Sequence, residues 1–191
     1  MRKWRRLQTA GGPRFVSALQ PHEAALLRTM ATSIQEMLDE RQSAVPADPL
    51  EQITGIRTGN ATAPEEATLR RLLPDFIKDT ATADEPDGSA GALRSLHEPE
   101  IIDAKISAAQ ELLDTLPGAE GRVELTEAQA NAWIAAVNDM RLSLGTILGV
   151  GAQGPERLPA GHPLATHLDV YQWLTVLQEY LVLGLMDKPI R

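Results

Sequence analysis

Apolar side chains recur at intervals of three and four residues along much of the chain, which is the spacing of one buried face of an α-helix. The stretch after Pro21 shows the pattern at Leu26, Leu27, Met30, Ile34, Met37 and Leu38. Comparable stripes follow later in the sequence. The pattern predicts helices over residues 20–41, 64–73, 90–116, 126–149 and 166–186.

Capping residues and prolines set the expected ends of these helices. Thr62 and Thr126 each stand three residues before a Glu or Gln, the spacing of a capping box, and predict two helix starts. Pro74 is expected to end the second helix, and Pro99 to mark a break or a start in the third. Gly149 is expected to end the fourth.

Two short segments within residues 1–19, Lys3–Gln8 and Arg14–Leu19, flank a Gly-Gly-Pro turn, which predicts a β-hairpin. A lone hairpin is barely stable in water, so we expect Arg122–Leu125 to add a third strand. A short helix is expected over 48–55, where Asp48, Pro49 and Gly55 supply a cap, a first turn and a stop. The Gly- and Pro-rich residues 150–165 are expected to form a flexible loop.

The last helix is apolar around most of its circumference, with only a narrow polar strip. One neighbouring layer cannot cover such a surface, so the helix either runs through the centre of the domain or pairs with a second copy of the chain. We expect a homodimer. The expected dimer contacts are Trp173, Leu177, Tyr180 and Leu181.

The composition changes this picture little. With 191 residues, 43% hydrophobic and 4% aromatic, the chain is expected to be one domain, 1–191, with an aliphatic core. The expected class is α+β, mainly α: a bundle of about five helices with a small N-terminal antiparallel sheet. The basic start lacks the apolar run of a signal peptide, and no segment is long enough to span a bilayer, so a cytoplasmic protein without membrane contact is expected.

The chemistry of the sequence argues against an enzyme. There are no cysteines, which removes disulfides and thiolate chemistry. His162, His167 and Asp169 have no standard metal-ligand spacing, and the glycines of 145–151 follow a helix rather than a strand, unlike a phosphate loop. We therefore expect no catalytic residue, metal or cofactor.

Two polar groups of residues remain as candidate sites. Asn138, Asp139 and Arg141 lie in the best-defined helix and are expected to form a structural ion-pair network with Arg70, Arg71 and Asp75. The alternative is a small-molecule or enzymatic cleft around Arg70, Asp139 and Arg141.

The other group is basic. Although the net charge is −8, the hairpin carries Lys3, Trp4, Arg5, Arg6 and Arg14. An aromatic among cations is typical of nucleic-acid surfaces, so a dimer could bind DNA through these strands. The preferred interpretation is an edge strand that its charges protect from unwanted pairing.

Three segments carry a family resemblance: Arg70–Asp75, Trp133–Gly145 and Tyr171–Gln178. Through them the chain resembles an actinobacterial family of uncharacterised domains, some of whose members are described as oxidative-stress-responsive transcription regulators. The resemblance implies regulation through cysteine oxidation and a sigma factor partner. Because this chain has no cysteine, it cannot be a disulfide switch. We therefore predict a non-enzymatic regulatory protein that acts through protein–protein contacts, with a sigma factor or another transcription component as partner.

Overall fold

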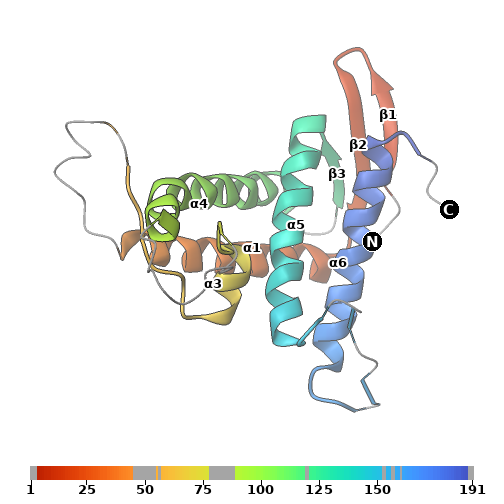
Figure 1. The fold of residues 1–191 in the computed structure, drawn as a ribbon. Coiled ribbons are helices and arrows are strands. Elements are labelled where there is room, and N and C mark those ends of the chain that lie inside the picture. Colours follow the sequence, from red (N-terminus) through yellow and green to blue (C-terminus); the bar gives the residue numbers. More distant parts are fainter. Residues whose placement is uncertain are drawn as a thin grey trace.

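A computed structural model gives the fold, and it describes residues 4–44, 55, 57–77, 89–118, 121–151, 154–155, 158–159 and 161–188. The order of the described elements is β1 (Arg5–Thr9), β2 (Gly12–Leu19), α1 (Pro21–Ser43), α3 (Ala67–Leu72), α4 (Ser89–Thr115), β3 (Gly121–Leu125), α5 (Glu127–Ile147) and α6 (Ala165–Leu185). The expected class, α+β and mainly α, is confirmed. Figure 1 shows α5 and α6 side by side, running across α1 and α4.

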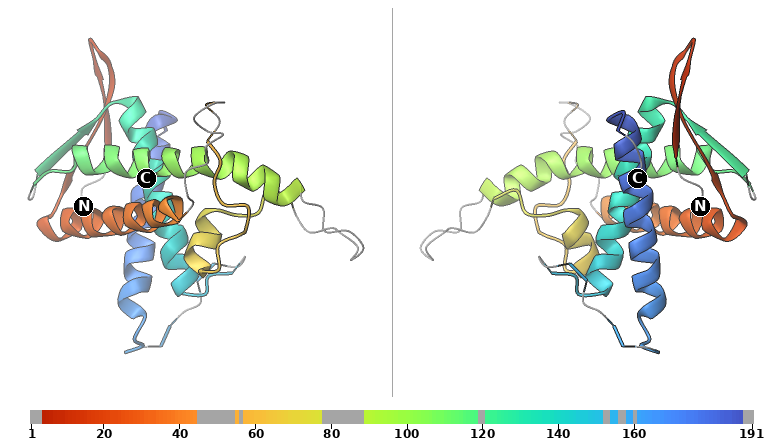
Figure 2. Two further views of the ribbon diagram at one scale, coloured as in Figure 1. Left: turned by 90° about the vertical axis from the view of Figure 1, so that its left-hand side faces the viewer. Right: turned by 90° about the vertical axis from the view of Figure 1, so that its right-hand side faces the viewer.

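The three strands form one antiparallel sheet in the order β1-β2-β3. Thr9 pairs with Gly12 at the hairpin end, and Phe15 pairs with Leu125 on the third strand. The expected hairpin and its third strand are therefore confirmed. Every residue of β1 is exposed, and the β1–β2 hairpin extends beyond the helices (Figure 2).

Both ends of α5 form as the sequence predicts. At the start, the Thr126 hydroxyl accepts from the Gln129 backbone N–H at 3.2 Å, and the Gln129 side chain accepts from the Thr126 N–H at 3.0 Å. At the end, Gly149 has a φ of 65°, and Val150 donates its N–H to the Gly145 carbonyl at 2.8 Å. This arrangement is a Schellman cap, in which a glycine takes the left-handed conformation just past the last turn.

The start of α3 differs from the expectation. The predicted capping box at Thr62 is wrong, because the helix begins only at Ala67, and Glu66 accepts from the N–H groups of Thr68 and Leu69. Burial is the largest single influence and raises the pKa of Glu66, but the hydrogen bonds from Thr68 and Leu69 together outweigh it, so this pKa lies below its usual value. A glutamate at the cap satisfies the same donors as the predicted threonine would have.

The predicted break at Pro99 is also wrong, because α4 continues through it. Proline has no N–H, so the Ser95 carbonyl lacks its usual helical donor. Gly59 replaces that donor, with its backbone N–H 2.7 Å from the Ser95 oxygen. A neighbouring segment therefore preserves a helix that local sequence rules would interrupt.

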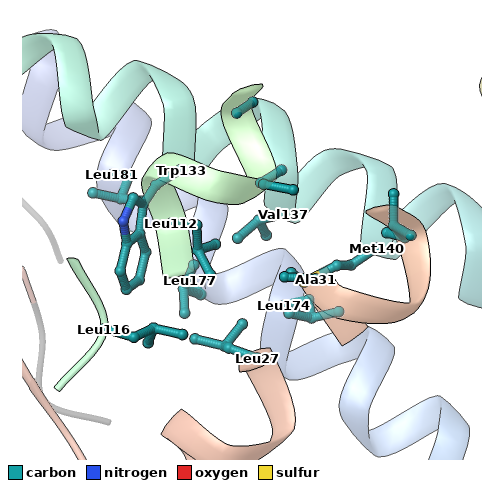
Figure 3. Close-up of a cluster of buried hydrophobic side chains, with 14 of the residues drawn as sticks. Leu27, Ala31, Leu112, Leu116, Trp133, Val137, Met140, Leu174, Leu177 and Leu181 are labelled. Carbon is teal, nitrogen blue, oxygen red and sulfur yellow. The ribbon is translucent and has the colours of Figure 1, made fainter. Parts of the chain in front are cut away.

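The core lies where α1, α4, α5 and α6 meet (Figure 3). Trp133 is fully buried near its centre. The side chains labelled around Trp133 are Leu27 and Ala31 of α1, Leu112 of α4 and Leu116 directly after it, Val137 and Met140 of α5, and Leu174, Leu177 and Leu181 of α6. The aliphatic core expected from the composition is present.

The last helix buries one face rather than its whole circumference. Leu174, Leu177, Leu181 and Gly184 are buried within the chain. Leu177 and Leu181 have no exposed surface, so the prediction that they are dimer contacts is wrong. At Gly184 a Cβ would lie 3.3 Å from the Phe15 ring, so the small residue permits close packing against β2.

Two expectations fall partly on residues outside the described set. These are the short helix over 48–55, of which only Gly55 is described, and the loop 150–165, which is described in part. Among the helices of the described residues, none is both long enough and apolar enough to cross a membrane.

Candidate functional site

Arg141 joins α5 to α6 through neutral partners. Its Nε donates to the Thr175 hydroxyl at 3.0 Å, and its Nη1 donates to the Gln178 side-chain oxygen. The guanidinium also lies over the Tyr171 ring, 5.4 Å from the centroid. The expected ion pairing of Arg141 with residues of 70–75 is therefore wrong, because α6 supplies its partners instead.

A pocket of about 210 Å³ opens beside this contact. It lies between the end of α5 and the start of α6, and Arg71 of α3 completes it. The lining residues are Arg71, Arg141, Leu142, Gly145, Thr146, Gly149, Val150 and Tyr171. The predicted cleft around Arg70, Asp139 and Arg141 is thus wrong in two of its three residues, since Arg70 and Asp139 do not line this pocket.

The two displaced residues have other contacts. Arg70 donates through Nε to the Pro64 carbonyl at 3.1 Å, within its own turn of chain. Asp139 lies at the α4–α5 interface, with Oδ1 2.6 Å from Lys105 Nζ. Asn138, next to it, is half-buried. Lys105 was not predicted, because nothing in the sequence places α4 beside this face of α5.

Burial in the core disturbs the ionisation of Asp139. Its side chain is 5% exposed. Burial raises the pKa of Asp139 above its usual value, while the hydrogen bond and charge of Lys105 act in the opposite direction without cancelling it. One ion pair therefore does not fully compensate the loss of water around this carboxylate.

A second buried network lies between α1 and α4 and was not predicted. Glu98 is 1% exposed, and its two oxygens accept from Arg41 Nε at 2.8 Å and Arg94 Nη1 at 2.7 Å. Arg94 also pairs with Asp75. The predicted site residue Asp75 therefore has Arg94 as its partner, and not Arg141. The spacing of Arg94 and Glu98, four apart on one helix, was the available signal in the sequence.

The aromatic residue of the basic hairpin is buried and is not available at the surface. Trp4 is 2% exposed and packs edge-on against Trp133, with ring centroids 5.7 Å apart. It cannot stack on a nucleic-acid base without leaving the core. Arg6 pairs with Asp187 at 2.8 Å, while Arg5 remains exposed and Arg14 is half-buried. Lys3 lies outside the described residues.

A partly exposed apolar row runs along α6 next to the face that is buried in the core; Trp173 and Tyr180 of this row also pack against the core, and Val176 is exposed. We call it the outer stripe: Trp173, Val176, Tyr180 and Leu183. The successive spacings are three, four and three, the spacing of the contact positions of a coiled coil. Two of the four expected dimer residues, Trp173 and Tyr180, lie in this row.

In the described part of the chain, no three His, Asp or Glu side chains come together as ligands.

Comparison with known proteins gives a family match over nearly the whole chain. The model of the family described as "Domain of unknown function (DUF2017)" matches residues 1–185. The chain is 62% identical over 195 residues to a protein named "Oxidative stress regulator AosR" in Mycobacterium bovis, and equally to the protein of that name in Mycobacterium tuberculosis strain H37Rv. Each alignment covers 98% of this chain and 89% of the relative. No solved structure matches the chain.

Proposed function

This protein belongs to the family of the domain of unknown function DUF2017, and we propose on that premise that it is a non-enzymatic regulator acting through protein–protein contacts. Its relatives are named oxidative stress regulators, which supports a regulatory role. The proposed partners are a second copy of the chain and a component of the transcription machinery, such as a sigma factor.

The outer stripe of α6 is the observation that carries the proposal. Trp173 and Tyr180 of the stripe are partly buried against the core, whereas Val176 is exposed, so part of the stripe is left without cover within the chain. Val176 is 38% exposed although it is a large aliphatic residue. A row of apolar residues at coiled-coil spacing favours another helix as its cover.

A second copy of the same helix fits this surface. Twofold dimers bring identical patches together, so a stripe along one helix can cover itself without any other complementary surface. The helix ends beside the hairpin, where Asp187 holds Arg6. A dimer through α6 therefore presents two copies of the hairpin, each with an exposed edge strand, to a further partner.

The regulation of this protein cannot depend on its own thiol groups. Without cysteine the chain forms no disulfide, so a change in its activity cannot come from a thiol switch of its own. We propose that it acts constitutively through its contacts.

The experiment is a co-purification with three baits: the intact chain, Val176→Lys and Val182→Lys. The two substitutions have the same chemistry on the same helix, and the two valines are 38% and 36% exposed, but only Val176 lies in the outer stripe. Individually expressed sigma factors and core polymerase subunits serve as prey. Retention by the intact chain and Val182→Lys, but not by Val176→Lys, is expected if the dimer is needed. Retention of none of them would refute the transcription partner.

Direct DNA binding by the hairpin is the second candidate. The exposed Arg5 and the position of the hairpin beyond the helices favour it. The buried Trp4 and the pairing of Arg6 with Asp187 reduce the cations and aromatics that a phosphate backbone could meet. A gel shift that disappears in the Arg5→Ala/Arg6→Ala protein would support DNA binding over the protein partner.

A further inference from the structure

We propose that the pocket between α3, α5 and α6 binds a small oxyanion, such as inorganic phosphate or the phosphate or carboxylate group of a small metabolite. The pocket holds two guanidinium groups, those of Arg71 and Arg141. Among the described residues that line it there is no aspartate or glutamate. A region of concentrated positive charge is unusual in a chain with a net charge of −8.

The charge on Arg141 is not neutralised by its own contacts. Thr175 and Gln178 are neutral, and they use only part of the donors of a guanidinium, which has five N–H groups. The Tyr171 ring holds the guanidinium plane at the pocket wall. The remaining N–H groups of Arg141 are therefore fixed in place before a ligand arrives, which lowers the entropy lost on binding.

Arg71 supplies the second cation from a different element. In the part of the chain that the structure describes, it makes no hydrogen bond or ion pair, although its neighbour Arg70 is bound to Pro64. Two guanidinium groups that line one small pocket repel each other. An anion bound between them is attracted by both, which offsets the repulsion. Planar, always-charged arginine forks match carboxylate and phosphate oxygens in geometry.

The dimensions of the pocket limit the ligand. At about 210 Å³ it is smaller than the roughly 300–1,000 Å³ of pockets that bury drug-sized molecules. A phosphate or carboxylate group fits, and a larger metabolite would leave the rest of its structure in solvent. Tyr171 and the outer stripe lie on different faces of α6, so the inference is independent of the proposed partner surface.

The test is a titration of the isotope-labelled protein with inorganic phosphate at constant ionic strength, followed by the backbone amide signals of Gly145, Gly149 and Val150. The compared variants are Arg71→Gln and Arg70→Gln, which remove the same charge from adjacent exposed positions. We expect saturable shifts in the intact protein and in Arg70→Gln, and binding at least about tenfold weaker in Arg71→Gln.

Three outcomes would overturn the proposal: no saturable shift with phosphate, sulfate or acetate; equal weakening in both variants; or shifts that avoid these three amides. Parallel titrations with sulfate and acetate distinguish the sources of the anion. Saturation by phosphate and sulfate alone supports a phosphate-type ligand, and saturation by acetate as well supports a carboxylate. An Arg141→Lys protein, which keeps the charge but loses the planar fork, is expected to bind all of them more weakly.

Discussion

Gly59 lies so close to Pro99 that a Cβ at position 59 would come within 2.9 Å of the proline Cγ. The same glycine donates its N–H to the Ser95 carbonyl that the proline leaves without a helical partner. Arg57, two residues earlier, adds a bond from its guanidinium to the Pro99 carbonyl at 3.1 Å. The segment 57–60 is therefore fitted to the proline and helps α4 to run on as one helix.

Gly59→Ala is expected to destabilise the protein by about 1–3 kcal/mol, because the added methyl must push the segment away and lengthen the bond to Ser95. Urea unfolding followed by circular dichroism measures the change. Gly118→Ala is the matched control, since a Cβ there meets nothing within 4 Å. Equal stability of the two variants would show that the close approach at Gly59 has no energetic importance.

Glu98→Gln is expected to reduce the free energy of unfolding by about 3 kcal/mol or more. The amide keeps the shape of the side chain but removes the negative charge that two buried or half-buried guanidinium groups share. The comparison is Glu124→Gln, whose pair with Arg122 is exposed and for which a loss of less than about 1 kcal/mol is expected. A loss at Glu98 as small as that at Glu124 would contradict a structural role for the network.

The stability that depends on Asp139 is expected to decrease as the pH rises. Because the folded pKa of Asp139 is raised, the folded state holds this proton more tightly than the unfolded chain does. The contribution is fully present below the unfolded pKa of about 3.9 and is lost as the pH rises through the folded pKa. The stability of the intact protein relative to Asp139→Asn is therefore expected to be greater at about pH 4 than at about pH 7.

A carboxyl titration by NMR measures the pKa of Asp139 directly. In Lys105→Met the lowering influence of the ammonium group is gone, so that pKa is expected to rise further. A pKa of Asp139 at or below the ordinary aspartate value in the intact protein would contradict the assigned balance between burial and ion pairing.

Local signals account for the parts of the fold that sequence analysis predicted well. Thr126 and Gln129 form the cap within the first turn of α5, and Gly149 ends the helix directly after its last turn. Both ends of that helix therefore follow from neighbouring residues alone. The continuation of α4 through Pro99 could not be predicted, since the missing donor comes from Gly59, about forty residues away along the chain. Similarly, the composition of α6 shows that it is apolar but not which of its faces the chain itself covers.

In the candidate sites too, contacts within one helix could be predicted from the sequence and contacts between helices could not. Arg94 and Glu98 are four residues apart on one helix, so half of their network was available in the sequence. The partners of Arg141 and Asp139 lie on other helices, and their identity depends on how α4 and α6 cross α5. The prediction that these polar residues are held by partners was reasonable, but the partners were not those expected.

Sedimentation of the intact chain, Val176→Lys and Val182→Lys over a range of concentrations tests the proposed dimer most directly. A charge in the outer stripe should prevent pairing of two α6 helices, whereas the same charge at Val182 should not. We expect dimers for the intact chain and Val182→Lys and a folded monomer for Val176→Lys. A monomeric intact chain, or three proteins that sediment alike, would contradict it.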